Sequence, residues 1–253
     1  MSERKQQRAP QLRAVQTKAA ILRAAAEVFD EFGFSGASIS KIMKRADVTQ
    51  GGMYFHFSSK EELAYAVMVG QGDGLEFPAG EDGLQHLVDI TLYLAEQLRH
   101  NPVLRAGVRL AVEQGEFGLR DDVAYQAWVL EFRQQLRFAR AKGELQPEVD
   151  DHELAWVLVS SFTGAQLFSQ ASTGRVDLPQ RIASLWRYLL PAVAADDIRD
   201  GLRLTLPPSE PTPEPVADSK VEPEPEPEPE SAPAPTPAPA PKRRSRSASE
   251  KRA

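Results

Sequence analysis

The sequence predicts an all-α protein with a three-helix head, a larger helical body and a disordered tail. Apolar residues recur every three or four positions from Arg13 to about Ala194, which is the spacing of amphipathic helices. Capping residues, prolines and glycines stand where such helices would begin and end. No stretch of useful length alternates between apolar and polar residues, as a strand requires.

The first region, residues 1–12, carries basic side chains without apolar periodicity, so we expect a disordered basic arm. Such an arm either lies against phosphates or in a minor groove, or only raises solubility. A helix is then predicted from about Arg13 to Phe32. It has a wide apolar stripe, and Gly33 is placed to end it as a C-terminal cap.

Residues 38–60, SISKIMKRADVTQGGMYFHFSSK, predict a helix-turn-helix. Apolar positions within residues 39–46 have helical spacing, and Ser38 is placed to cap this short helix. After a tight turn, Thr49 can cap a second short helix over residues 50–57. Two short helices joined by a turn of about three or four residues form the motif.

The outward face of the second helix offers amides, bare backbone, a phenol and an imidazole, which suit base edges and phosphate oxygens. Two adjacent glycines cost roughly 2 kcal/mol of helix propensity, which favours close approach of another molecule over a merely loose helix start. The residues on this face are Gln50, Gly51, Gly52, Tyr54 and His56.

A third helix is predicted to open at Ser59, where Ser59 to Glu62 form a capping-box sequence. Its free amides, together with the charge of Lys60, predict a phosphate-binding site. We therefore expect residues 13–60 to be a helix-turn-helix DNA-binding domain.

Residues 61–206 are predicted to form a helical ligand-binding and dimerisation domain. The last helix has an unusually wide apolar face, which predicts a four-helix bundle with a second subunit; burial in a monomer core is the alternative. After the helix that Ser59 opens, the expected helices cover residues 81–100, 102–115, 121–142, 150–172 and 178–194.

Two of these body helices carry aromatic residues at helical spacing, and two interpretations of them stay open. Such residues usually belong to a core. Thr163, Gly164 and Gln166, however, place a hydroxyl, a gap and an amide in an otherwise apolar helix, which favours a small-molecule cavity. The residues assigned to this cavity are Tyr125, Trp128, Phe132, Phe162, Thr163 and Gln166.

From Pro207 the chain alternates proline with glutamate or alanine and ends in the basic tip KRRSRSASEKRA. Residues 207–253 are therefore expected to be a disordered tail. It either solubilises the protein or holds DNA non-specifically through its tip.

Charge is distributed unevenly along the chain. Residues 1–60 carry ten basic against five acidic side chains, whereas residues 61–206 carry 13 against 22. This asymmetry favours a DNA-binding head on an acidic body despite the net charge of −6.

Composition excludes several classes of protein. The chain has no cysteine, and neither a signal peptide nor an apolar run long enough for a membrane span is evident, so we expect a soluble cytoplasmic protein. The four histidines lack metal-ligand spacing, and no nucleophile elbow, P-loop or dinucleotide-binding motif is present. We expect no metal, no cofactor and no catalytic residues.

At VTQGGMYFHFSSKEEL the chain resembles the TetR family of one-component repressors. The runs RAVQTKAAILRAAAEVFDEFG, SSFTGAQLFS and LWRYLLP resemble its γ-butyrolactone autoregulator receptors, and the likeness covers about residues 10–195. The resemblance implies that Trp128 lines the ligand pocket and that Thr163 meets a polar group of the ligand. The DNA contacts it implies are Ser38, Ser40, Gln50, Gly51, Gly52, Tyr54, His56 and Lys60.

The resemblance implies a homodimeric repressor that binds a pseudo-palindromic double-stranded DNA operator. A small apolar γ-butyrolactone-like signal would release it and so control antibiotic production. One alternative is a pseudo-receptor that answers a butenolide, a furan or an antibiotic; another is a DNA-binding protein that needs no ligand.

Overall fold

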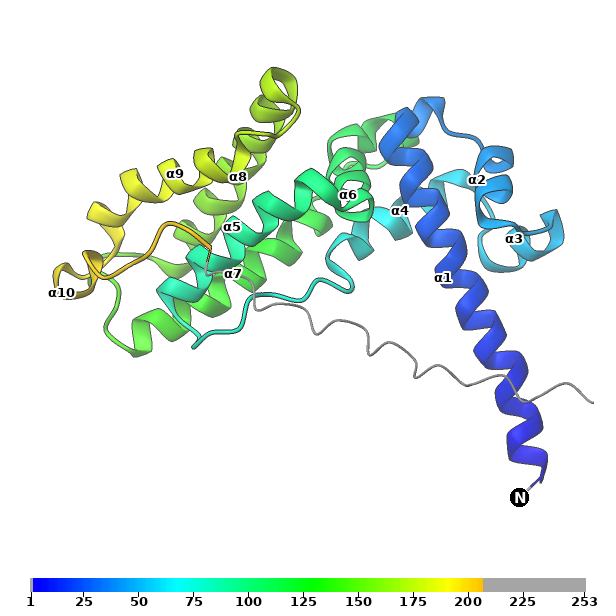
Figure 1. The fold of residues 1–253 in the computed structure, drawn as a ribbon, viewed down its shortest axis with the longest axis horizontal. Helices are drawn as coiled ribbons and strands as arrows, with labels where there is room; N and C mark the ends of the chain where they lie inside the picture. The colour runs from blue at the N-terminus through cyan, green and yellow to red at the C-terminus, as the bar shows by residue number, and fades with distance from the viewer. Residues whose placement is uncertain (1, 207–253) are drawn as a thin grey trace, which may run out of the picture. The chain divides into compact units, whose positions relative to one another are not determined.

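The computed structural model describes residues 2–206, with side chains from Arg13 onward, and within this range the fold is all-α as predicted (Figure 1). Its extended elements there amount to one isolated bridge between Leu145 and Ala194. The predicted tail, residues 207–253, lies outside the described residues.

Helix α1 (Ser2–Gly36) begins eleven residues before the predicted start at Arg13. The predicted disordered arm is therefore helical from Ser2 onward. Arginine, lysine, glutamine and alanine favour helix, and extending an existing helix avoids a new nucleation cost. The break at Gly33 is where the sequence places the helix end, and its φ of 69° suits glycine.

The helix-turn-helix consists of α2 (Ile39–Ala46) and α3 (Gln50–His56), followed by α4 (Lys60–Val69). All three expected caps form: the side-chain oxygens of Ser38, Thr49 and Ser59 accept the amides of Lys41, Gly52 and Glu62 at 3.3, 3.2 and 3.1 Å. Asp47 makes the turn between α2 and α3 with a left-handed φ of 52°. Caps read from the sequence therefore fix the boundaries of this motif.

The core of the head extends into the body. Ile42, Met53 and Leu63 from α2, α3 and α4 are buried against α1, and the same cluster includes Ala106 and Leu110 of α6. Accordingly α1 and α4 both pack on α6. The helix-turn-helix and α6 therefore share one packed core.

The body helices largely follow the prediction. The predicted helix over residues 81–100 starts three residues late, because Gly83 adopts a φ of 141° that a helix does not allow. Helix α9 continues through Pro191 and ends two residues later, at Val193. The elements are η1 (Gly70–Gly72), α5 (Leu84–His100), α6 (Pro102–Glu113), η2 (Gln114–Phe117), α7 (Val123–Ala141), α8 (Asp151–Thr173), α9 (Leu178–Val193) and α10 (Asp196–Arg199).

A second core holds the body together. Helix α5 lies against α7 and α9, and α8 packs on α7 and α9. Trp186 of α9 is fully buried, and its indole Nε1 donates a 2.7 Å hydrogen bond to Thr91 Oγ1 of α5. The one polar atom of this buried side chain is thus satisfied, as a core requires.

Candidate functional site: a cavity in the body and the exposed helix of the head

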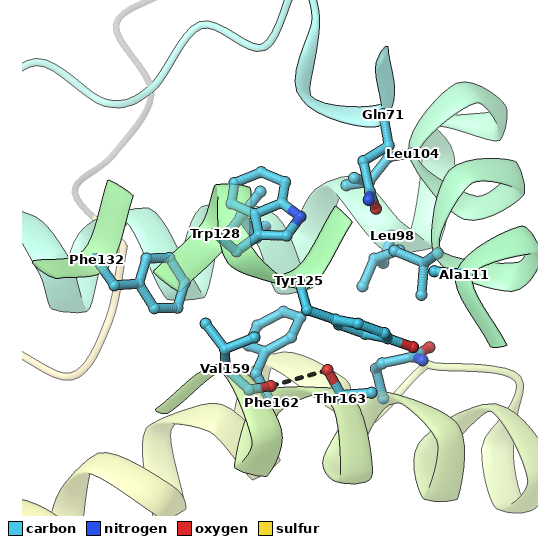
Figure 2. Close-up of a pocket in the computed structure, with 13 residues that line it drawn as sticks. Gln71, Leu98, Leu104, Ala111, Tyr125, Trp128, Phe132, Val159, Phe162 and Thr163 are labelled. Carbon is cyan, nitrogen blue, oxygen red and sulfur yellow. Dashed lines mark hydrogen bonds between the residues drawn. The ribbon is translucent and has the colours of Figure 1, made fainter. Parts of the chain in front are cut away.

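A largely apolar cavity lies between η1 and helices α5 to α8 (Figure 2). Tyr125, Trp128 and Phe132 come from α7, and Figure 2 shows Phe162 and Thr163 of α8 facing them. The structure thus brings all six residues that the sequence assigns to a cavity to one place. The full lining is Gln71, Leu94, Leu98, Leu104, Val108, Ala111, Tyr125, Trp128, Phe132, Val159, Phe162, Thr163 and Gln166.

Trp128 is half-buried, unlike the core residue Trp186. Its ring centroid lies 6.3 Å from that of Phe132. A Cβ built on Gly72 would lie 3.5 Å from the indole Cη2, so the η1 turn covers one edge of the ring. Part of the indole surface faces the cavity, which favours the cavity interpretation over the core interpretation.

Polar groups in this wall are few and distinct. The Thr163 hydroxyl donates to the Val159 carbonyl at 2.8 Å. The Gln166 Nε2 group is buried and has no hydrogen-bond partner among the described residues, so it remains a donor for a ligand. Burial raises the pKa of the Tyr125 phenol, which keeps it protonated.

The cavity is narrow. The volume in which the centre of a water molecule fits is about 40 Å³. This space admits a few waters, whereas ligand pockets for drug-sized molecules usually have volumes of about 300 Å³ or more. A ligand with a ring and an acyl chain would therefore have to displace wall residues as it enters.

Gln71, a residue outside the predicted cavity set, connects this wall to the head. It lies on η1, directly after α4, and is buried against Gly107 of α6. A Cβ at Gly107 would overlap the Cβ of Gln71 and lie 3.3 Å from the Val67 carbonyl oxygen. A glycine inside a predicted helix was the available signal, because such a residue often marks close helix packing.

The five residues predicted on the outward face of α3 differ in exposure. Gln50, Gly51 and Tyr54 are exposed, and Gly52 and His56 are half-buried. No described atom lies within 4 Å of a Cβ built on Gly51, so the packing of this chain does not account for that glycine. Ser38 and Ser40 lie at the start of α2, with their hydroxyls 3.1 Å apart.

Lys60 has a second role that the sequence did not reveal. Its ammonium donates to the carbonyls of Phe34 and Ala37, at 3.0 and 3.3 Å, and lies 4.0 Å from the Phe34 ring centroid. One N–H of Lys60 is thus left for a phosphate, because the other two donate to carbonyls at the end of α1. At the start of α4, the carboxylate of Glu62 accepts the Ser58 amide at 2.7 Å.

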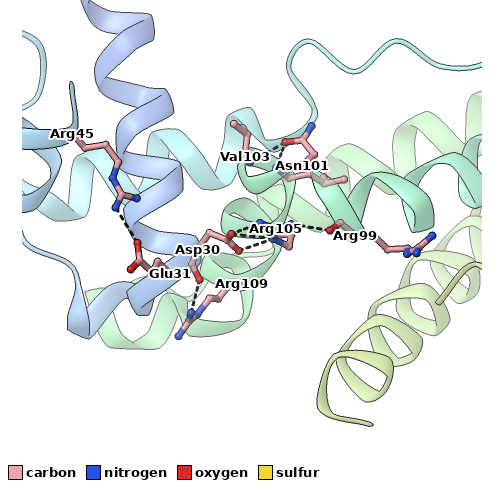
Figure 3. Close-up of polar contacts among 9 residues, drawn as sticks. Asp30, Glu31, Arg45, Arg99, Asn101, Val103, Arg105 and Arg109 are labelled. Carbon is pink, nitrogen blue, oxygen red and sulfur yellow. Dashed lines mark hydrogen bonds and ion pairs between the residues drawn. The ribbon is translucent and has the colours of Figure 1, made fainter. Parts of the chain in front are cut away.

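A polar cluster fastens α1 to α6 (Figure 3). Arg105 donates hydrogen bonds of 2.6 to 3.0 Å to the Asp30 carboxylate, and Arg109 donates to the Asp30 backbone carbonyl at 2.9 Å. Arg109 also pairs with Glu113, whose second oxygen accepts the Phe34 amide at 2.8 Å. Helix α6 therefore lines the cavity on one face and holds α1 on the other.

Comparison with known proteins decides the family. Residues 21–67 match "Bacterial regulatory proteins, tetR family", and residues 81–194 match "Tetracyclin repressor-like, C-terminal domain". The A-factor receptor protein of Streptomyces griseus is 44% identical over 186 residues, which cover 74% of this chain and 67% of that protein. This chain belongs to the TetR family.

Solved structures agree with this assignment. Full-length TylP, a TetR regulator from Streptomyces fradiae, is 41% identical, with a TM-score of 0.70 over 76% of this chain and 93% of TylP. A γ-butyrolactone receptor is 30% identical, with a TM-score of 0.58 over 75% of this chain and 94% of that receptor. The predicted family, including its likeness to γ-butyrolactone receptors, is confirmed.

The chain is accordingly a TetR-type DNA-binding repressor, and its family consists of transcription regulators. Between residues 2 and 206, no helix combines the length and the apolar composition that crossing a membrane requires.

Proposed function

We propose that this TetR-family repressor binds a pseudo-palindromic operator as a homodimer and releases it when a γ-butyrolactone-like molecule enters the body cavity. In this way it would control genes for antibiotic or other secondary metabolite production. The observation that carries the proposal is the narrow cavity whose wall includes Trp128 and Thr163 and continues through Gln71 into α4.

The lining fits a small apolar lactone. Aromatic and aliphatic side chains would cover its ring and acyl chain, and burying each methylene contributes about 0.8 kcal/mol. The Gln166 amide and the Tyr125 phenol are donors for its carbonyl or hydroxyl oxygens. A hydrophobic pocket with a few converging polar groups is typical of small-molecule sites.

Release follows from the narrowness of the cavity. A ligand that moves Gln71 outward would also move α4, because Gln71 lies on η1 directly after that helix. Helix α4 packs on α1 and follows the DNA-facing helix α3, so its displacement changes the spacing of the two heads in a dimer. A ligand that prefers the DNA-incompetent conformation a hundredfold shifts the equilibrium by about 2.7 kcal/mol per site.

The test is an electrophoretic mobility shift with the DNA upstream of the protein's own gene. A panel of γ-butyrolactones, butenolides, furans and antibiotics is titrated into the complex, and we expect a γ-butyrolactone to release the operator saturably. Release by another class alone would identify a pseudo-receptor. An operator complex that no member releases would instead indicate a repressor that needs no ligand.

A further inference from the structure

A second cleft, of about 360 Å³, lies between α1, α6 and the C-terminal end of α8, outside the lactone cavity. Its chemistry differs from that of the cavity, because its wall is mostly charged. The side chains that matter here are Asp30, Arg105, Arg109, Glu113, Gln166 and Arg175.

Arg175 is buried, and no carboxylate of the described residues forms an ion pair with it. Its side chain lies in a residue that is 8% exposed, and its Nη2 donates to the Gln166 Oε1 at 3.2 Å. Its Nε has no hydrogen-bond partner among the described residues, and no carboxylate there lies within 4 Å of its nitrogens. A buried charge without a partner costs several kcal/mol, so a counter-ion is expected at this position.

The backbone also holds Arg175 in an unfavourable conformation. Its φ is 71°, in the left-handed region that residues other than glycine rarely adopt. Burial lowers the pKa of its guanidinium, and the positive charges of Arg105 and Arg109 also lower it, whereas the negative charge of Asp30 opposes them in part. Strain, burial and like charge together act against this cation, and strained residues of this kind cluster at ligand sites.

Both carboxylates of the cleft already form ion pairs with arginines other than Arg175. Asp30 pairs with Arg105 at 2.6 Å, and Glu113 pairs with Arg109 at 2.7 Å. Three guanidinium groups against two carboxylates leave one positive charge, and Arg175 is the group without its own acid. The cleft therefore has the charge to accept one anion.

Apolar surface borders this charge. Val112 of α6 and Leu167 of α8 line the same cleft, and both are about half exposed. An anion that also carries a short hydrocarbon chain would cover them, whereas an inorganic ion would leave them exposed. Guanidinium groups bind planar carboxylates with two parallel hydrogen bonds, which favours a carboxylate head.

We propose that this cleft is a second small-molecule site, which binds an organic carboxylate with a short apolar chain and uses Arg175 as its anchor. It is separate from the lactone site of the proposed function, and the two share Gln166. The Gln166 oxygen accepts from Arg175, while its Nε2 belongs to the wall of the lactone cavity. Gln166 accepts from one of the five N–H groups of Arg175, so other donors of the guanidinium remain for a carboxylate.

The test is isothermal titration calorimetry of the full chain with hexanoate, acetate and hexanol at constant ionic strength. We expect one hexanoate per subunit. Acetate should bind at least tenfold more weakly because it lacks the chain that covers Val112 and Leu167. Hexanol should not bind here, because it lacks the charge. The Arg175→Met variant should lose hexanoate binding at least tenfold, and the matched control Arg137→Met, an exposed arginine of α7, should keep it.

Two further measurements test the site. If Arg175→Met does not fold, Val112→Ser at the exposed rim should weaken hexanoate severalfold and leave acetate unchanged. Hexanoate that does not bind the wild type, or that binds Arg175→Met equally well, refutes the site. If sedimentation then shows that Arg175→Met dissociates the dimer, the counter-charge comes from the partner subunit instead. None of these readouts involves DNA or a lactone, so the proposed function can fail independently.

Discussion

The three tryptophans of this chain sit in three different surroundings. Trp186 is fully buried and hydrogen-bonded, Trp128 lies half-buried at the cavity, and Trp156 is 55% exposed on α8. Sequence patterns alone do not separate them, because each occupies an apolar stripe of a helix. Their surroundings predict different consequences for the same substitution.

Trp128→Ala should preserve the fold and the operator complex while weakening the response to ligand. The indole covers one face of the cavity, so its loss should lower ligand affinity about thirtyfold, equivalent to about 2 kcal/mol. Trp186→Ala is the matched control and should destabilise the body by about 3 to 5 kcal/mol. Melting curves and operator release by the two variants check this. A Trp128→Ala protein that releases DNA at the wild-type ligand concentration would refute the assignment.

Lys60 and Tyr54 should separate stability from DNA contact. Lys60→Ala removes hydrogen bonds to the Phe34 and Ala37 carbonyls, so it should destabilise the head by about 1 kcal/mol or more. If its third N–H binds a phosphate, a plot of log operator affinity against log salt concentration should also become less steep. Its slope should decrease in magnitude by about one. Tyr54→Ala, at an exposed position, should weaken operator binding without changing the melting temperature.

Operator titrations at several salt concentrations distinguish the two roles of Lys60. An unchanged slope would show that Lys60 stabilises the head but does not contact a phosphate. Unchanged operator affinity in the Tyr54 variant would remove Tyr54 from the DNA interface.

At the scale of elements, α3 carries the glycine that the fold does not need. Gly51→Ala places its methyl group in open space within a helix, so it should stabilise the head by about 1 kcal/mol. This corresponds to a melting temperature that is higher by about 2 to 4 °C. If DNA approaches this backbone closely, operator affinity should nevertheless fall severalfold.

The control for Gly51 is Gly115→Ala, since Gly115 also has open space and an ordinary φ but lies in the body. It should leave operator affinity unchanged. A Gly51 variant that binds the operator as tightly as the wild type would show that DNA does not approach this position.

Helix α6 is the element that connects cavity and head, and Gly107 tests this connection. Gly107→Ala would force its methyl group against Gln71, which separates η1 and α4 from α6 as we propose that a ligand does. Overpacking of this kind costs about 1 to 3 kcal/mol. We expect weaker operator binding without ligand, measured alongside the melting temperature. Full operator affinity in a folded variant would contradict a role of this contact in release.

At the scale of the whole molecule, helix α8 has an exposed apolar surface of the kind that a second subunit covers. Phe168 is 81% exposed, and Trp156 on the same helix is 55% exposed. Gly164 is exposed between them, and no described atom lies within 4 Å of a Cβ built there. A small residue among large apolar ones suits close approach of another helix, as in the proposed four-helix bundle of a dimer.

Phe168→Glu should therefore dissociate the dimer and weaken operator binding at least tenfold, because a single head makes too few contacts for a specific site. Leu130→Glu, at an exposed apolar position of α7, is the matched control and should stay dimeric. Sedimentation velocity and operator titration measure both effects. A dimeric Phe168→Glu protein, or equal dissociation of both variants, would show that α8 is not the dimer surface.

The sequence by itself determined which residues share a helix face. Ser38, Thr49 and Ser59 mark helix starts because a side-chain oxygen next to free amides is a local requirement. Helical spacing likewise puts Tyr125, Trp128 and Phe132 on one stripe, and all of them line the cavity. Capping and periodicity act over a few residues, so a sequence contains them fully.

Only the tertiary structure decided what each stripe faces. Gln71 in the cavity wall, the contact of Lys60 with the end of α1, and the isolation of Arg175 all depend on residues that are distant in sequence. Asp30 and Arg105 meet although 75 positions separate them. Such pairs result from how helices pack, which depends on the side chains of both partners at once and leaves no short-range pattern in either.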